Sequence, residues 1–268
     1  VLAKRADLNS DGIVDDNDLT LLHEHIDTND LAGDIAPAAK RDGIVDQQDV
    51  DLLMQYLHTE IPPYTGNPAL REPGLVAHWP LDESKGNIAG NPLGFMGSLQ
   101  GDPTWLPEGG MIDGALELDG IDDYIKTPRV LETRPCSFSI FVWIKGGAPG
   151  QVILSYAGSS YRVRSNWLAA NAIDGSLMTE LRFFPSDAIP LHSQTVITDG
   201  DWHRVGLVWD GTHRTLFVDD IKVASDAYEA GKLLSGDLHI GAGMQLDTGT
   251  FWSGLIDDVR IYNRAITP

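Results

Sequence analysis

Oxygen-bearing side chains near the start of the chain have the spacing that a hard metal ion requires. Positions 1, 3, 5, 9 and 12 of a twelve-residue loop are Asp7, Asn9, Asp11, Asp15 and Asp18. Ca²⁺ binds about 6–8 oxygen ligands, and a loop of this spacing wraps once around the ion, with a glycine at the sharp turn. The backbone carbonyl of Ile13 offers a further ligand, and Gly12 permits the turn. The loop therefore predicts a calcium site, against the alternative of a merely acidic loop before a helix.

A second copy of the loop lies 31 residues further along, where the segment 42–46 repeats the segment 11–15. In strict register its positions 1 and 3 are Ala38 and Lys40, which offer no carboxylate. The acidic residues that remain are Asp42, Asp46 and Asp49. Two alternatives follow: a lengthened loop in which Asp34 supplies the missing carboxylate, or an empty second site.

Each copy ends in an amphipathic helical pattern. Apolar residues at i, i+3 and i+7 share one helix face, and in the two copies they are Leu19, Leu22 and Ile26, then Val50, Leu53 and Leu57. Neither helix can bury its apolar stripe alone, so we expect the two helices to pack against each other.

These repeats begin with a loop rather than a helix, and position 12 of the first loop is Asp18 rather than Glu. Both features resemble the dockerin type I family, over roughly residues 5–58. The resemblance implies a protein partner, either a cohesin-like module in trans or the remainder of this chain in cis. It further implies that loop positions 10 and 11 read the partner, and these are Asp16, Asn17, Gln47 and Gln48.

The charge balance limits the classes of partner. A formal charge of −20 argues against nucleic acid, because phosphate binding needs a basic face. No apolar run approaches the roughly 18 residues of a membrane span, and a single cysteine cannot form an internal disulfide. Val1 in place of a starter Met indicates a piece of a longer product.

The pattern of residue types changes twice along the sequence. After residues 1–58, a segment rich in proline and glycine, 59–74, predicts a semi-rigid linker. From 75 to 268 short alternating runs stand between turn residues, as in a β-sandwich or barrel. The clearest runs are Phe138 to Ile144, Trp202 to Trp209, Thr215 to Val218 and Leu255 to Tyr262.

Five stretches of the second part resemble, in family order, the laminin-G-like, concanavalin-A-like jelly-roll domains. They are residues 75–83, 118–124, 137–143, 202–220 and 251–264. The expected fold class is therefore mainly β, an antiparallel jelly-roll sandwich with a small α-helical EF-hand-like module before it. The resemblance implies frequent carbohydrate or protein binding and, with the dockerin-like part, a secreted or bacterial cell-surface protein.

Asp257 predicts a second calcium site. Strict alternation places it on one strand face with Leu255, Val259 and Ile261, where a lone charge is costly. Related jelly rolls use an aspartate of the last strand to hold calcium, and we expect Asp82 and Asp119 to join it. A salt bridge or backbone hydrogen bonds are the alternative.

Aromatic and cationic residues in one region are candidates for ligand binding. They are Tyr161, Arg162, Arg164, Trp167 and Arg182. Three arginines in an acidic module suit an acidic sugar or another carboxylate, against the alternative of a solvated face with scattered ion pairs. Trp79, Trp143 and Trp209 are expected in the core.

Laminarinase-type glucanases share the expected fold and carry two catalytic carboxylates on one strand. Residues 117–122 come close to that pattern, but Gly120 breaks the strand into a turn. We therefore expect no catalytic residues and a non-catalytic binding or scaffolding protein. A structural surface element without a glycan ligand is one alternative, and a glycoside hydrolase of the laminarinase type is another.

Removing calcium should unfold the first 58 residues, because metal binding supplies the folding free energy of so small a module. Far-UV circular dichroism of residues 1–60 should lose its helical signal in EDTA. Asp11→Ala should abolish the calcium response, whereas Asp16→Ala, at a position that does not bind the ion, should retain it. Helicity that survives chelation would contradict the assignment.

Overall fold

The computed structural model describes residues 13–14, 16–25, 47, 50, 53–54 and 59–60 near the start of the chain. After them it describes residues 72–131, 137–158, 165–181, 189–228 and 236–268. The chain divides into two compact units, Val1–Arg71 and Glu72–Pro268. The boundary falls inside the segment 59–74 that the sequence predicts as a linker.

The first unit contains a strand followed by a helix, in the order that the loop pattern predicts. Strand β1 (Ile13–Val14) precedes helix α2 (Asp16–His25). β1 pairs antiparallel with β2 (Thr59–Glu60), so the first two residues of the predicted linker pair with the loop region instead. None of the described helical segments is long and apolar enough to cross a membrane.

Most of the predicted apolar stripe residues that the structure describes in this unit are buried, although Leu19 is only half-buried. Leu22 of α2 and Leu53 are fully buried, and Val50 nearly so. Gln47, Val50, Leu53 and Met54 have helical conformation. These positions agree with two amphipathic segments, while most of the predicted calcium ligands lie outside the described residues.

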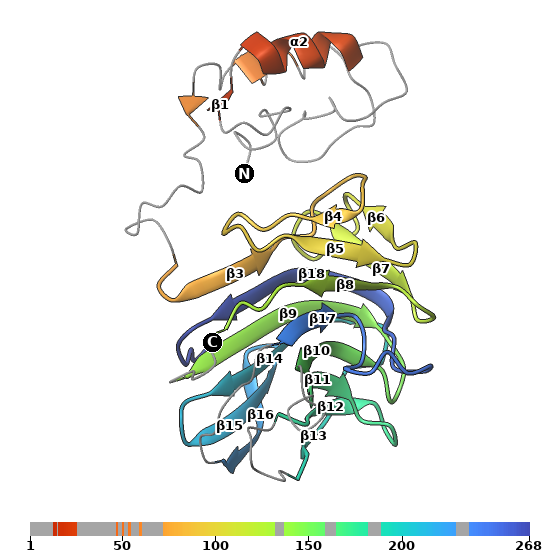
Figure 1. Cartoon of the computed structure of the whole chain (residues 1–268), viewed down its shortest axis with the longest axis vertical. Helices are drawn as coiled ribbons and strands as arrows, with labels where there is room; N and C mark the ends of the chain where they lie inside the picture. The colour runs from red at the N-terminus through yellow and green to blue at the C-terminus, as the bar shows by residue number, and fades with distance from the viewer. Residues whose placement is uncertain are drawn as a thin grey trace. The chain divides into compact units, whose positions relative to one another are not determined.

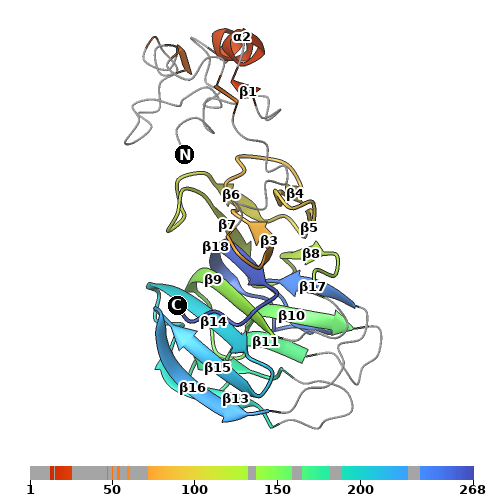
Figure 2. The same ribbon diagram turned by 90° about the vertical axis from the view of Figure 1, so that its left-hand side faces the viewer.

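The second unit consists of two eight-stranded antiparallel sheets, which form the two layers in Figures 1 and 2. We name each sheet after a central strand. The β17 sheet has the order β13 (Leu191–Val196), β12 (Ser176–Thr179), β11 (Ser165–Ala170), β10 (Val152–Gly158), β17 (Gly236–Ile240), β8 (Tyr124–Thr127), β5 (Gly97–Gln100) and β4 (Ile88–Ala89).

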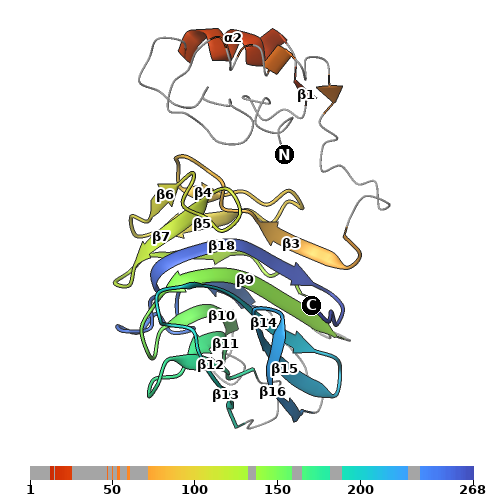
Figure 3. The same ribbon diagram turned by 180° about the vertical axis from the view of Figure 1, so that it is seen from behind.

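The β18 sheet lies nearer the viewer in Figure 3. Its order is β16 (Ile221–Ala227), β15 (His213–Val218), β14 (Trp202–Trp209), β9 (Phe138–Gly146), β18 (Ser253–Tyr262), β7 (Ala115–Asp119) and β6 (Thr104–Leu106). The first strand of the unit, β3 (Leu75–Trp79), also pairs with β18. The four clearest runs of the sequence thus lie in β9, β14, β15 and β18, and the predicted sandwich is confirmed.

Apolar side chains from both sheets meet in one core. Trp79 and Trp209 are buried there as predicted, whereas Trp143 is only half-buried. Trp167 stacks on Tyr156 with ring centroids 5.1 Å apart and on Phe138 at 5.3 Å. Large aromatic rings in contact contribute much of the apolar area that such a core removes from water.

The last three residues of the predicted linker pack on the end of the sandwich. The Tyr262 hydroxyl donates to Glu72 Oε1 at 2.8 Å, and Arg264 Nε donates to the Pro73 carbonyl at 2.6 Å. The Asn263 amide donates to the Gly74 carbonyl at 2.8 Å. The sandwich therefore begins at Glu72, three residues before its first strand.

Arg214 of β15 is a buried cation that joins the two sheets. Its guanidinium donates to Asp226 on β16 (Nε to Oδ1, 3.0 Å) and to the carbonyls of Leu181 and Ile189 at 2.8 and 2.9 Å. It also lies over the Tyr228 ring, 4.5 Å from the centroid. All three nitrogens of the guanidinium therefore donate to protein groups.

Arg214→Ala should lower the unfolding free energy by about 3 kcal/mol, because it leaves Asp226 and two carbonyls without their partner. All seven tryptophans lie after residue 74, so denaturation followed by tryptophan fluorescence reports the sandwich alone. The exposed Lys222→Ala is the control and should change the value by less than about 0.5 kcal/mol. Equal stability of the two variants would contradict a clamping role.

Candidate functional site

A β-bulge in β18 places two adjacent carboxylates where this strand changes partners. Residues 253–256 pair with β7, and residues 259–262 pair with β3. Between Asp257 and Arg260 the pairing with β9 shifts register, and Asp258 has a φ of 47°. A bulge inserts one unpaired residue and re-aims the side chains beside it.

The bulge changes which side chains of β18 face the core, so the strict alternation predicted from the sequence is wrong for this strand. Ile256, Val259 and Ile261 all lie in the main core, so Leu255 does not share their face. Asp257 is therefore not in line with the core side chains. It is buried on the other side of the strand, where the Ile112 amide donates to its Oδ2 at 2.8 Å.

The environment of Asp257 leaves one carboxylate oxygen without a partner. The side chain is fully buried, and Oδ1 has no hydrogen bond to any described residue. Burial, and then the nearby charges of Asp258 and Asp82, raise the pKa of Asp257 to about 7, although the Ile112 amide acts in the opposite direction. An isolated buried carboxylate of this kind is costly unless a cation or a proton neutralises it.

Asp258, unlike Asp257, has partners for both of its carboxylate oxygens. His78 Nε2 lies 2.7 Å from its Oδ1, and Arg260 Nε lies 2.9 Å from its Oδ2. Burial acts to raise the pKa of Asp258, but the His78 hydrogen bond and the Arg260 charge outweigh it and hold the pKa below its ordinary value. Of the two neighbouring carboxylates, only Asp257 lacks a cationic partner among the described residues.

Asp82, which lies three residues after the end of β3, is close enough to Asp257 to raise its pKa. Its Oδ1 accepts the Gly114 amide at 3.0 Å, just before β7 begins. A Cβ at Gly110 would lie 2.9 Å from Asp257 Oδ2, so position 110 must lack a side chain for this segment to approach the carboxylate. Glu83 instead turns to the Gly90 amide, at 2.6 Å from its Oε1.

The residues at this point fit a hard divalent cation such as Ca²⁺. Asp257 Oδ1 is a buried oxygen that no described donor reaches, and Asp82 brings a second carboxylate close enough to raise the Asp257 pKa. Oxygen ligands are those that Ca²⁺ prefers. Asp257 and Asp82 would hold the ion, which would stabilise the junction of β3, β7 and β18.

Asp119 does not join Asp257, contrary to expectation. It ends β7, whereas Asp82 contacts Gly114 just before the start of that strand. Asp119 instead belongs to a second acidic group, whose ligand atoms lie within 4.8 Å of one another and can hold a metal ion: Asp102, Asp119, Asp122 and Asp123. Here Asp119 Oδ1 accepts the Ile121 amide at 2.7 Å, as in an ordinary turn.

Most ligands of the predicted first loop lie outside the described residues: Asp7, Asn9, Asp11 and Asp15. The same holds for Asp34, Asp42, Asp46 and Asp49 of the second copy and for Gln48. Ile13 lies in β1, Asp18 is buried in α2, and Asp16 and Asn17 begin that helix. Gln47 is helical and exposed. The EF-hand pair therefore stays a prediction.

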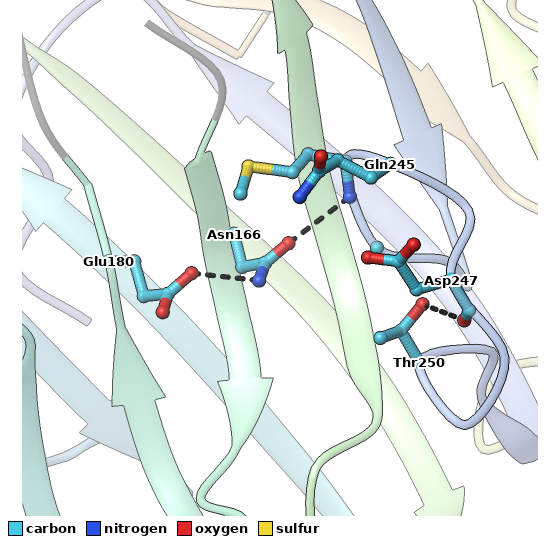
Figure 4. Close-up of a pocket in the computed structure, with 7 residues that line it drawn as sticks. Asn166, Glu180, Gln245, Asp247 and Thr250 are labelled. Carbon is cyan, nitrogen blue, oxygen red and sulfur yellow. Dashed lines mark hydrogen bonds between the residues drawn. The ribbon is translucent and has the colours of Figure 1, made fainter. Parts of the chain in front are cut away.

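A second candidate site is a polar hollow on the outer face of the β17 sheet (Figure 4). It is lined by Asn166, Glu180, Gly243, Met244, Gln245, Asp247 and Thr250. Asn166 projects from β11, Glu180 follows β12, and the rest belong to the loop between β17 and β18. It encloses about 350 Å³, part of which is open to solvent.

Asn166 connects the strands of this hollow to its loop. Its Nδ2 donates to Glu180 Oε2 at 2.8 Å, and its Oδ1 accepts the Met244 amide at 3.2 Å. The Asp247 carboxylate and the Gln245 carboxamide make no hydrogen bond to another described residue and lie on the loop side in Figure 4. Polar groups that are fixed but not satisfied are suited to a ligand rich in hydroxyl groups.

Several backbone contacts hold this loop against the sheet. The Ser155 hydroxyl donates to the Ala242 carbonyl at 2.7 Å, and the Val152 amide donates to the Thr250 carbonyl at 3.0 Å. A Cβ at Gly243 would lie 2.6 Å from Thr250 Oγ1, so the two turns of the loop pack directly on each other. The loop therefore presents Gln245 and Asp247 in a fixed position.

Of the five residues predicted to bind a ligand, only Trp167 lies among the described residues. Trp167 is fully buried and stacked in the core, so it is not an exposed platform for a sugar. Its neighbour Asn166 faces outward instead, because successive side chains of a strand point to opposite faces. Tyr161, Arg162, Arg164 and Arg182 lie outside the described residues. Period-two alternation identifies Asn166 as outward-facing, but no sequence signal places the distant loop 243–250 beside it.

The residues weighed for catalysis are engaged in local structure. Gly120 has a φ of 79° and forms the expected turn after Asp119. His203 has Asp219 2.9 Å from Nδ1 and Asp199 3.1 Å from Nε2. Burial acts to lower the His203 pKa, but these two carboxylates outweigh it and raise the pKa. This histidine is therefore held between Asp199 and Asp219 and serves the local structure.

The fold places the chain among antiparallel β-sandwich proteins. The model of the concanavalin A-like lectin/glucanases superfamily, Laminin_G_3, matches residues 119–268, more than half of the 268 residues. The chain therefore belongs to this family. The structure extends the sandwich to Glu72, ahead of the matched segment. No curated protein matches the sequence.

Among solved structures, the chain is similar to domain 4 of AbnA, a GH43 extracellular arabinanase from Geobacillus stearothermophilus, in complex with arabinotriose. The identity is 19% and the TM-score 0.55, over 74% of this chain and 96% of that domain. At this identity the likeness shows the fold alone.

Two further structures are longer than this chain. The binding domain of Paraclostridial Mosquitocidal Protein 1 is 14% identical with a TM-score of 0.55, over 72% of this chain and 49% of that domain. Trypanosoma rangeli sialidase in complex with sialic acid is 11% identical with a TM-score of 0.56, over 72% of this chain and 31% of the sialidase. The chain thus spans about half of the first and a third of the second.

The stability of the metal-free sandwich should fall as pH rises from about 4 to about 7. The folded state raises the pKa of Asp257 from 3.8 to about 7, so it binds the proton more tightly than the unfolded chain does. Ionisation therefore destabilises the fold, by at most about 4 kcal/mol. Tryptophan-monitored denaturation in EDTA at several pH values measures the loss.

Calcium should reverse this loss above pH 7, and Asp257→Asn should abolish both the pH dependence and the response to calcium. Asp119→Asn, in the second acidic group, is the matched control for Asp257 and should keep both. If calcium stabilises the Asp257→Asn variant as much as the parent, the ion is bound elsewhere.

Proposed function

We propose that the chain is an extracellular, non-catalytic binding protein whose sandwich binds carbohydrate at the polar hollow. The hollow itself carries this proposal. It combines fixed amide and carboxylate groups with one apolar side chain, Met244, on a rigid outer face of the β17 sheet. Sugars offer hydroxyl donors and an apolar ring face, and this lining complements both.

Family membership supports the proposal at the level of the fold. The fold is of the lectin and glucanase type, and the structure of the arabinanase domain contains a bound trisaccharide of arabinose. That domain is matched over almost its whole length, so the unit compared is a complete sandwich. At 19% identity the likeness does not identify the glycan of this chain.

Two observations favour binding over hydrolysis. Retaining glycosidases need two carboxyl groups about 5–5.5 Å apart on either side of the scissile bond. Asp119 and Asp123 instead accept backbone hydrogen bonds, at 2.7 Å from Ile121 and 2.8 Å from Asp102 respectively. His203 is held between two carboxylates that raise its pKa. These groups serve turns and loops rather than a reacting bond.

The cation site and the first unit complete the proposal. A calcium ion held by Asp257 and Asp82 stiffens the sandwich and takes no part in chemistry. The dockerin-like repeats bind calcium and dock a cohesin-like module, or the sandwich in cis. A structural surface element without a glycan ligand is the competing function, and it predicts that the hollow binds nothing.

A glycan array probed with the whole chain in calcium should yield at least one bound carbohydrate. Asn166→Ala should weaken that binding about tenfold, because it removes two hydrogen bonds that shape the hollow. Gln194→Ala, exposed on β13 of the same sheet, should leave the affinity unchanged. Thermal melts of both variants check that the fold is intact.

The same glycans incubated with the chain should show no new reducing ends. Reducing-sugar release that Asp119→Asn or Asp122→Asn abolishes would overturn the non-catalytic assignment. An array without any bound glycan would overturn carbohydrate binding and leave the structural function.

A further inference from the structure

The charge of the polar hollow narrows the class of sugar that it accepts. The structure describes seven residues that line it, and these include two carboxylates, Glu180 and Asp247, and no positively charged side chain. The other polar groups are the amides of Asn166 and Gln245 and the hydroxyl of Thr250. The lining is therefore anionic.

The hydrogen bonds of the hollow leave mainly acceptors for a ligand. The Asn166 amide holds Glu180 through Oε2 and takes the Met244 amide on its own oxygen. The Thr250 hydroxyl donates to the Asp247 carbonyl at 2.7 Å, so its proton is engaged. The Asp247 carboxylate meets no donor among the described residues. A carboxylate that is ionised only accepts hydrogen bonds.

Resting on the proposed function, we propose that the hollow receives a sugar residue with a protonated amine, whose ammonium group is bound by the Asp247 carboxylate, with Glu180 adding negative charge on the other side of Asn166. An ammonium group supplies three donors and a positive charge where the hollow offers acceptors and negative charge. Hydrogen bonds between charged partners are roughly twice as strong as neutral ones. Hydroxyl groups of the same ring bind the amides, and its apolar face lies on Met244.

The net charge of the chain acts in the same direction at longer range. A chain of formal charge −20 repels a polyanion and attracts a polycation. A glycan that carries an amine on many residues is therefore concentrated near the surface, whereas uronic acid or sulfated polymers are repelled. The steering weakens with added salt.

The sequence alone predicts a ligand of the opposite charge, an acidic sugar or another carboxylate. Arg162, Arg164 and Arg182 suit an acidic sugar, and they lie outside the described residues. The described lining favours a cationic sugar, so the two hypotheses predict opposite rankings of glycans. A direct comparison of glycans with the same backbone and different charge decides between them.

The test is isothermal titration of the whole chain, in calcium, with hexamers of glucosamine, N-acetylglucosamine and glucose in the same β-1,4 linkage. The pH is kept low enough to protonate the sugar amine. The glucosamine hexamer should bind about tenfold more tightly than the other two, and the preference should shrink in high salt. An oligogalacturonate and a short polylysine complete the set.

Asp247→Asn should remove most of the preference for the amine, and Glu180→Gln should reduce it, while both variants retain the shape of the hollow. Asp201→Asn removes an equal charge from an exposed turn and should retain the preference. Equal binding of all three hexamers would overturn the amine assignment but leave carbohydrate binding intact.

Tighter binding of the oligogalacturonate would overturn the proposal in favour of the arginines. Binding of polylysine without any glycan would overturn both the amine assignment and carbohydrate binding, and would indicate a protein partner.

Discussion

The bulge in β18 is the constraint on which the rest of the sandwich depends. β18 pairs with β9 along one side, and along the other it pairs first with β7 and then with β3. One extra residue lies where β18 changes its partner from β7 to β3, and it places two neighbouring carboxylates in different environments. Asp258 is neutralised by His78 and Arg260, while Asp257 is buried with one oxygen unsatisfied. β18, which pairs with three strands of this sheet, thus also contains a buried carboxylate oxygen that has no hydrogen bond to any described residue.

The polar hollow depends on a different set of contacts. Asn166 is the only side chain among the lining residues that bonds to both the strand side and the loop side. The loop is held to β10 through backbone groups, so its exposed side chains can serve a ligand. A site of this kind separates the residues that fix its shape from those that select what it binds. The fold can therefore keep one while the other changes.

The sandwich of the second unit was predictable from the sequence, and its sites were predictable only in part. Period-two runs of aromatic and β-branched residues are a local signal, and they located β9, β14, β15 and β18. The burial of Asp257 was predictable because a carboxylate amid apolar residues is anomalous in any register. Its true face was missed because a bulge leaves no mark on composition. Trp167 was misplaced because one aromatic side chain suits a core as well as a surface. The hollow unites β11, the end of β12 and a loop much further along the chain, which only tertiary structure brings together.

Arg214 makes one wall of the polar hollow dependent on the opposite sheet. From β15 in one sheet it fixes the Leu181 and Ile189 carbonyls, which flank the connection between β12 and β13 in the other. Leu181 directly follows Glu180, a wall of the hollow. Because Leu181 is anchored from the opposite sheet, the position of its neighbour Glu180 depends on Arg214 as well as on β12. The selectivity of the hollow therefore depends in part on a side chain that does not line it.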